Sequence, residues 1–184
     1  MKLTKKHDEF VKKCLTDIGM AREFLQTYLP PMVKDKCNFN NLRIDSGSYI
    51  EDDLKAHASD IVYQVDLINN GGYAYIYCLI EHQSNSDDLM SYRILRYQLA
   101  VIQRHMEKYP KDGLPLVVPI VFYNGTKTPY PYSTQLADLF VDKDLFEQIG
   151  LGNFKLADLT VIEDSEIAQH KKLAFVEILL KHIR

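Results

Sequence analysis

The residues whose types and spacing best suit chemistry lie between positions 58 and 84. Asp60 stands in a stretch where apolar and polar side chains alternate, and Glu81 and Gln83 stand near the end of a second such stretch. Between the two stretches lies Asn-Asn-Gly-Gly at 69–72, residue types that tolerate the positive φ of tight turns. Period-two alternation on both sides of such a turn predicts a β-hairpin.

The position of the turn decides which side chains face each other. A two-residue turn centred on Asn70 and Gly71 makes Asp60 the direct partner of Glu81, with Cβ atoms about 5 Å apart. Gln83 shares that face because it lies two residues further along the strand. Two facing carboxylates repel each other unless a cation lies between them, and Mg²⁺ is held by one or two carboxylates with waters and substrate phosphates. The hairpin therefore predicts a metal site on Asp60 and Glu81 that takes Mg²⁺, with Mn²⁺ as a substitute.

A long helix is predicted directly after the hairpin, over residues 89–109. Polar residues at 84–88 supply its cap, and Pro110 ends it. Arg93 and Tyr97 lie one turn apart near its start, so both are candidates for binding phosphate close to the acids. A guanidinium matches phosphate oxygens in pairs. The alternative is an ordinary surface arginine in contact with an aromatic ring.

The remaining pattern predicts a chain of helices and strands around the hairpin. We expect helices over 10–18 and 21–29, a polar irregular segment over 32–48, a buried central strand over 114–123, short helical pieces at 136–140 and 145–149, a last strand over 154–161 and a helix over 165–184. Pro119 inside the apolar run lacks a donor, which predicts a bulge or a backbone nitrogen that faces an edge. Tyr130 and Tyr132 lie in the loop after this run, where they either stack on bases or cover the core.

Composition indicates one globular domain over residues 1–184. The chain has 46% hydrophobic and 26% charged residues, which is enough to bury one sizeable core. Without an apolar run near the length of a membrane span, and without an apolar core near its start, it is expected to be cytoplasmic with no membrane partner. Its 3 cysteines lie far apart and suggest neither a disulfide framework nor a zinc site. The net charge of −3 excludes a uniformly basic nucleic-acid binder, so any DNA contact uses local patches or metal ions.

Several short motifs along the chain resemble one known family. In order they are HDEF, AREFLQTYLP, SDIVYQV, LIEHQS, LMSYRILRY, LPLVVPIVFYNG and ADLT. They resemble the Rpn family of recombination-promoting nucleases, also described as YhgA-like putative transposases, over nearly the whole chain. Asp60 followed by Glu81-His82-Gln83 also resembles the PD-(D/E)xK nuclease site.

The resemblance implies an α/β fold with a restriction-endonuclease-like mixed central β-sheet flanked by α-helices. It implies a Mg²⁺-dependent DNA endonuclease, linked to DNA recombination or mobile elements and acting as a homodimer. Asp60, Glu81 and Gln83 are then the catalytic residues. Gln83 stands where the superfamily usually has lysine, so it can orient a water but brings no positive charge.

Other acidic residues are second-rank candidates for this site. The resemblance suggests Asp158, which could equally be a turn acid at the end of a strand. Glu51 and Asp53 either add a metal ligand or belong to a solvated acidic cluster. His82 lies on the face opposite Glu81, which favours a structural role over that of a general base.

Two other functions compete with the nuclease. A DDE-type transposase would use Asp60, a later acid such as Asp158 and a glutamate on a helix, whereas Glu81 is predicted on a strand. A catalytically silent DNA-binding or regulatory module fits the missing lysine and the acidic net charge, but gives no reason for two facing carboxylates. The last predicted helix has no cap, and members of the resembling family carry a further C-terminal segment. The chain is therefore expected to be truncated before such a segment.

Overall fold

The computed structural model describes residues 10–45, 59–68, 72–81, 87–123, 127–152, 156–170 and 172–182. The side chains at 59, 60, 77–81 and 172 are outside this description, although their backbone is within it. The chain divides into two compact units, Met1–Leu139 and Phe140–Arg184. Each unit is described by itself.

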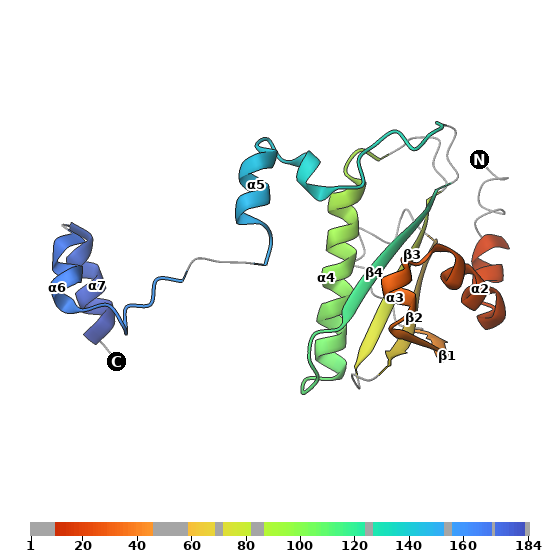
Figure 1. Ribbon diagram of the computed structural model, residues 1–184, viewed down its shortest axis with the longest axis horizontal. Helices are drawn as coiled ribbons and strands as arrows, with labels where there is room; N and C mark the ends of the chain where they lie inside the picture. Colours follow the sequence, from red (N-terminus) through yellow and green to blue (C-terminus); the bar gives the residue numbers. More distant parts are fainter. Residues whose placement is uncertain are drawn as a thin grey trace. The chain divides into compact units, whose positions relative to one another are not determined.

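The first unit is built on a four-stranded mixed sheet (Figure 1). Its strands follow the chain in the order β1 (Cys37–Ile44), β2 (Ser59–Leu67), β3 (Tyr73–Glu81) and β4 (Leu116–Tyr123). The β1–β2 and β2–β3 pairs are antiparallel, and β3 and β4 are parallel. The predicted hairpin is therefore confirmed as β2 and β3, and helix α4 (Met90–Lys108) forms the crossover that a parallel pair requires.

The register of the hairpin differs from the predicted one by two residues. Asp60 pairs with Leu79 rather than with Glu81, and Ser59 pairs with Ile80. A 2.9 Å hydrogen bond from the Leu67 amide to the Gly72 carbonyl continues the same register towards the turn. Because side chains alternate with a period of two, this shift leaves positions 60 and 81 on the same face. They are diagonal neighbours instead of direct partners.

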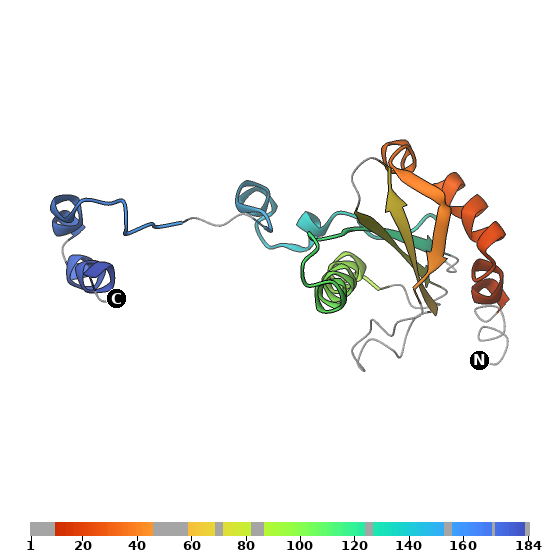
Figure 2. The ribbon, with the colours of Figure 1, turned by 90° about the horizontal axis from the view of Figure 1, so that it is seen from below.

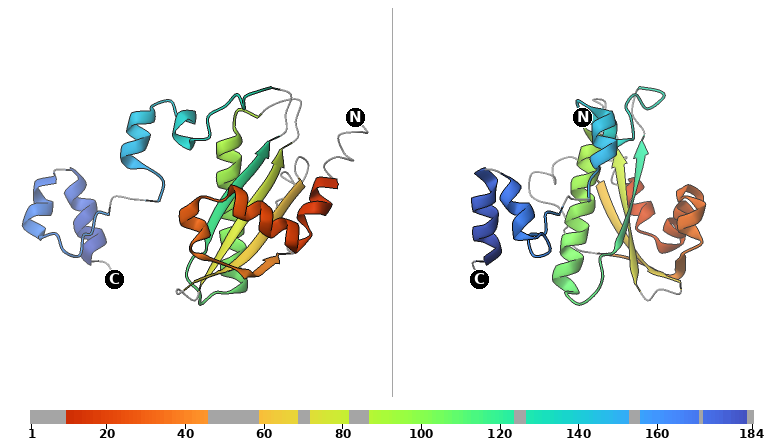
Figure 3. Two further views of the ribbon diagram at one scale, coloured as in Figure 1. Left: turned by 45° about the vertical axis from the view of Figure 1, so that its right-hand side comes forward. Right: turned by 60° about the vertical axis from the view of Figure 1, so that its left-hand side comes forward.

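Helices cover both faces of the sheet (Figures 2 and 3). On one face Val62 and Tyr75 pack against Ile94 and Val101 of α4. The other face is covered by α2 (Ile18–Tyr28), α3 (Pro31–Lys34) and the helical residues 10–15. Tyr63 and Leu25 both belong to the buried core on this face. This is the predicted α/β architecture, a mixed sheet with helices on both faces as in restriction-endonuclease-like folds.

Helix α4 forms because one face of its sequence is apolar and packs against the sheet. Asp87 Oδ1 accepts a 2.9 Å hydrogen bond from the Leu89 amide at the start, and the last turn carries Lys108. The buried positions of the helix recur every three or four residues, namely Met90, Ile94, Tyr97, Val101 and His105. The helix predicted over 89–109 is therefore confirmed.

Two segments of the first unit differ from their predictions. Residues 32–48, predicted to be irregular, contain α3 and the edge strand β1, whose ladder shifts register between Asn38 and Arg43. Only two residues of β1 are buried, so its sequence carries little alternation. The apolar run at 114–123, predicted to be a buried central strand, forms β4, which lies at the edge of the sheet and has no fully buried residue. Pro119 suits this position, because an edge strand needs no donor on its outer side.

The second unit contains only helices and loops in its described residues. The helices are α5 (Lys143–Ile149), α6 (Asp164–Ile167), η2 (Ala168–His170) and α7 (Lys172–His182), while η1 (Leu136–Leu139) belongs to the first unit. The short helical pieces are confirmed. The strand predicted over 154–161 is wrong, since 156–158 have no regular structure and 159–162 form a turn and bend. The helix predicted over 165–184 is broken into α6, η2 and α7.

No helix in the described parts of the chain combines the length and the apolar character that crossing a membrane would require.

Candidate active site

The candidate site lies at the end of the sheet where β3 and β4 finish. Glu81 is the last residue of β3, and its parallel partner is Tyr123, the last residue of β4. The antiparallel strand β2 begins at this same end, with Asp60 as its second residue. Strands β2 and β3 thus bring two acidic positions to one end of the sheet, and β4 adds Tyr123 beside them. Ligands of open α/β sheets commonly bind at such an end.

The strand register also assigns the two acidic positions to one face. Position 60 shares its face with Val62, which packs in the core under α4, and position 81 shares its face with Tyr75 in the same core. Diagonal neighbours on an antiparallel pair have Cβ atoms roughly 7 Å apart. The structure thus places positions 60 and 81 close together, and by register both belong to the face of the sheet that α4 covers. Gln83, Glu51, Asp53 and His82 lie outside the described residues.

Arg93, a candidate for binding phosphate, lies in the first turn of α4. Its Nη1 is 2.6 Å from Oδ2 of Asp87, and its Nη2 lies 3.4 Å from Sδ of Met90. Only 13% of its side chain is exposed, so it is not an ordinary surface arginine. A phosphate at this place would compete with the Asp87 carboxylate for the guanidinium.

Tyr97, the second phosphate candidate, lies one turn further along α4. It is 1% exposed and packs in the core between the helix and the sheet. Its ring therefore supports the helix that carries Arg93, and a substrate phosphate cannot contact it in this arrangement.

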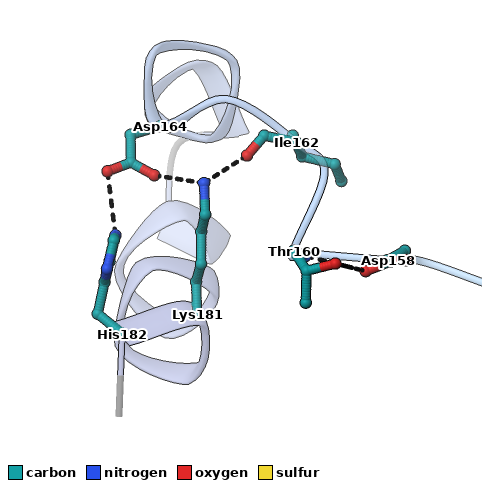
Figure 4. Close-up of polar contacts among 6 residues, drawn as sticks. All are labelled: Asp158, Thr160, Ile162, Asp164, Lys181 and His182. Atoms are coloured by element: carbon teal, nitrogen blue, oxygen red, sulfur yellow. Dashed lines mark hydrogen bonds and ion pairs between the residues drawn. The ribbon is translucent and has the colours of Figure 1, made fainter. Parts of the chain in front are cut away.

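Asp158, the second-rank acid, lies in the second unit and closes a turn (Figure 4). Its Oδ1 accepts hydrogen bonds from the amide and the hydroxyl of Thr160, at 2.9 and 2.6 Å. These two hydrogen bonds lower the pKa of the Asp158 carboxyl below its ordinary value. This geometry fits the alternative role considered for Asp158, that of an acid that stabilises a turn.

A second carboxylate of this unit joins α6 to α7 (Figure 4). Asp164 accepts hydrogen bonds from Lys181 Nζ at 2.7 Å and from His182 Nε2 at 3.0 Å. Lys181 also donates to the Ile162 carbonyl at 2.6 Å. The hydrogen bonds from Lys181 and His182 lower the pKa of Asp164, and the three contacts fix the end of α7 against α6.

Among the residues whose side chains are described, no group of three or more His, Cys, Asp or Glu could hold a metal ion. The predicted ligands Asp60 and Glu81 are not among these residues, because only their backbone is described. The metal site thus stays a prediction, supported by the placement of the two strands.

A feature that sequence reasoning missed is a cavity beside the candidate site. It has a volume of about 530 Å³ and lies between α4, β4 and the loop at 130–136. Tyr123 and Tyr130 line it, with ring centroids 4.9 Å apart in a T-shaped arrangement. The tyrosines in this loop were the only signal in the sequence, because the cavity depends on how the loop folds back onto α4.

Comparisons with known proteins agree with this architecture. The family model described as "Putative transposase, YhgA-like" matches residues 5–184. The chain is 42% identical over 181 residues to Recombination-promoting nuclease RpnC of Escherichia coli K12, which covers 98% of this chain and 59% of that protein. It is 42% identical over 178 residues to Recombination-promoting nuclease RpnA of the same strain, covering 97% of this chain and 60% of the relative.

A third relative has a different name at the same similarity. Inactive recombination-promoting nuclease-like protein RpnE of Escherichia coli K12 is 42% identical over 178 residues, covering 97% of this chain and 58% of that protein. The chain thus spans about three-fifths of the length of these relatives. No solved structure matches it. Because the family model matches nearly the whole chain and the relatives share 42% of its residues, the chain belongs to the YhgA-like putative transposase family.

Proposed function

We propose that this chain is the catalytic domain of a metal-dependent DNA endonuclease that hydrolyses phosphodiester bonds. The observation that carries the proposal is the β2–β3 register, which assigns Asp60 and Glu81 to one end and one face of the sheet. The names of RpnC and RpnA support it and link the activity to recombination. The cytoplasm is the compartment in which we expect it to act, with DNA as its substrate.

The two acidic positions suit a hard divalent cation. Carboxylate oxygens are the ligands that Mg²⁺ prefers, and Mn²⁺ accepts the same donors. Asp60 and Glu81 would hold the ion as diagonal neighbours, which relieves the repulsion between them. When bound, the ion polarises the scissile phosphate and lowers the pKa of the attacking water.

Two further residues complete the proposed site. Gln83 follows Glu81 by two positions, and its side-chain amide orients the attacking water by hydrogen bonding. Arg93 supplies positive charge to the phosphate by exchanging its Asp87 partner for a phosphate oxygen. This charge takes over part of the role that lysine has in related nuclease sites.

A catalytically silent DNA-binding module is the second candidate. The observation in its favour is that RpnE, named inactive, is as similar to this chain as RpnC and RpnA are. The DDE-type transposase has less support, because position 81 lies on a strand and Asp158 is held in a turn.

Conversion of supercoiled plasmid by the purified chain tests the proposal. Cleavage is expected with Mg²⁺, and it is expected to stop with EDTA or with the substitution Asp60→Ala. A gel-shift assay on the same samples separates the two candidates. DNA binding without cleavage, with both Mg²⁺ and Mn²⁺, would establish the silent module instead.

A further inference from the structure

The cavity next to the candidate site has walls from three parts of the first unit. Helix α4 contributes Ile94 and Gln98, strand β4 contributes Val121 and Tyr123, and the loop contributes Tyr130 among others. The loop is fixed to the helix, since the Ser91 hydroxyl donates a 3.1 Å hydrogen bond to the Ser133 carbonyl. The wall is thus formed by side chains that are already positioned. Its volume of about 530 Å³ is within the range of small-molecule sites.

The lining selects against a charged ligand. The residues that line the cavity, all of them within the described part of the chain, include no lysine, arginine, aspartate or glutamate. A phosphate placed there would lose its hydration without meeting a cation, which is costly. The lining therefore favours a neutral ligand.

The polar groups of the cavity point to a planar heterocycle. Gln98 donates its Nε2 to the Val117 carbonyl at 3.0 Å, which fixes the amide and leaves its Oε1 as an acceptor. Thr134 adds a hydroxyl that can donate or accept. Tyr123 is held by a 2.9 Å hydrogen bond from its hydroxyl to the Lys127 carbonyl. An aliphatic ligand would make no hydrogen bond to the Gln98 acceptor or to the Thr134 hydroxyl, whereas a nucleobase offers flat faces to aromatic rings and donors along its edge.

The cavity is close enough to the candidate site to act on the same DNA. Tyr123 is the direct partner of Glu81, and neighbouring strands lie about 4.8 Å apart. One DNA strand advances about 3.4 Å per nucleotide, so this spacing corresponds to one or two nucleotides. A base adjacent to the scissile phosphate can thus enter the cavity once it leaves the stack.

We propose that this cavity binds one nucleobase, turned out of the DNA stack next to the phosphate that is cleaved. The proposal rests on the proposed nuclease function, and it adds a base-reading contact beside the acids. Enzymes that act on a base extrude it into a pocket of this kind, so the same physical step is available here.

Photocrosslinking locates the base directly. The Asp60→Ala chain is mixed with duplexes in which thymine is replaced by 5-iodouracil or adenine by 8-bromoadenine, irradiated, and mapped by mass spectrometry. The expected crosslinks are on Tyr123 or Tyr130. Crosslinks confined to residues outside the cavity would overturn the proposal, because they would show that no base enters it.

Two variants and a matched control measure the contribution of the cavity to DNA binding. Gln98→Leu removes the acceptor, and Thr134→Phe fills the space from an exposed loop position. Gln103→Leu is the control, the same substitution on the same helix at an exposed residue outside the cavity. Filling the cavity should weaken DNA binding about 5- to 150-fold, the range for loss of one base–aromatic stacking contact. Affinities of both variants equal to that of the control would overturn the proposal.

Plasmid cleavage by the wild-type chain separates this proposal from the nuclease itself. Cleavage without crosslinks in the cavity overturns the base pocket alone. Crosslinks on Tyr123 or Tyr130 without cleavage support base binding in the cavity, and they overturn both the nuclease and the place of the base beside a cleaved phosphate.

Discussion

The repulsion between Asp60 and Glu81 can be measured as a coupling energy in the absence of metal. The changes are Asp60→Asn, Glu81→Gln and the double variant. The β2–β3 register makes these positions diagonal neighbours on one face. Neutralising either acid should therefore stabilise the metal-free chain, and neutralising the second should add little.

The expected size follows from the register. Unit charges roughly 7 Å apart repel by about 0.6 kcal/mol in water and about 2 kcal/mol at an effective dielectric constant of about 20. Salt near 0.1 M, with a Debye length of about 10 Å, reduces these values by about half. We expect each single variant to raise the free energy of unfolding by about 1 kcal/mol in EDTA, with a coupling energy of similar size.

Urea unfolding of the four chains in EDTA and in Mg²⁺ provides the assay. Mg²⁺ should stabilise the wild type and remove the advantage of the variants, because it binds only the intact pair. A control cycle pairs Asp60→Asn with Glu107→Gln, at the far end of α4, and should show no coupling. A coupling energy of zero for Asp60 and Glu81 in EDTA, or equal stabilisation of all four chains by Mg²⁺, would refute the shared site.

Further predictions concern three residues with described contacts. The Tyr75 hydroxyl is 3.0 Å from Nδ1 of buried His105, so Tyr75→Phe should lower the free energy of unfolding by about 1–3 kcal/mol, and an unchanged urea midpoint would contradict this. Burial also raises the pKa of Tyr75 to about 12, so the stability given by its neutral phenol is complete below pH 10 and lost as pH rises through 12. The melting temperature of the wild type should therefore fall at alkaline pH, and Tyr75→Phe should reduce this fall. An identical fall in both chains would show that a group other than Tyr75 causes it. The hydrogen bonds from Lys181 and His182 lower the pKa of Asp164, so Asp164→Asn should speed amide exchange in α7 near neutral pH. The difference between variant and wild type should vanish as pH falls through the lowered pKa of Asp164, and equal exchange rates at neutral pH would contradict the prediction. Arg93→Gln should reduce the salt slope of DNA binding by about one phosphate contact, whereas an unchanged slope would restrict Arg93 to its pair with Asp87.

The sequence predicted the elements that carry the candidate site, but not the register between them. The hairpin and α4 were predictable because alternation in the strands and apolar spacing in the helix are regular there. The register was not, because Asn69, Asn70, Gly71 and Gly72 all tolerate positive φ and leave the centre of the turn open. A shift of two residues keeps every side chain on its face, so the hydrophobic pattern cannot detect it.

The edge strands show a second limit of the pattern. The apolar run of β4 reflects helices packed on both of its faces, where Val121 faces α4 and Phe122 contacts Phe24 of α2 at 5.4 Å between ring centroids. An apolar run of this kind indicates that both faces of the strand are covered. It does not indicate whether the strand lies at the centre or at the edge of the sheet. Strand β1 was missed for the converse reason, because most of its side chains are polar and only Cys37 and Leu42 are buried.

The cavity was beyond sequence reasoning because its walls are far apart along the chain. Ser91 and Ser133 meet across 42 residues, and local patterns contain no information on such a contact. The tyrosines at 130 and 132 indicated an aromatic loop without showing what it covers.

The most direct test of the central claim compares plasmid cleavage by Asp60→Ala and Asp158→Ala in Mg²⁺. The proposed site predicts that Asp60→Ala loses at least about a hundredfold in rate, since it removes a metal ligand from the reacting phosphate. Asp158→Ala should cleave like the wild type, because Asp158 holds a turn through Thr160. Normal cleavage by Asp60→Ala, or loss of cleavage in Asp158→Ala with an unchanged melting temperature, would contradict the account.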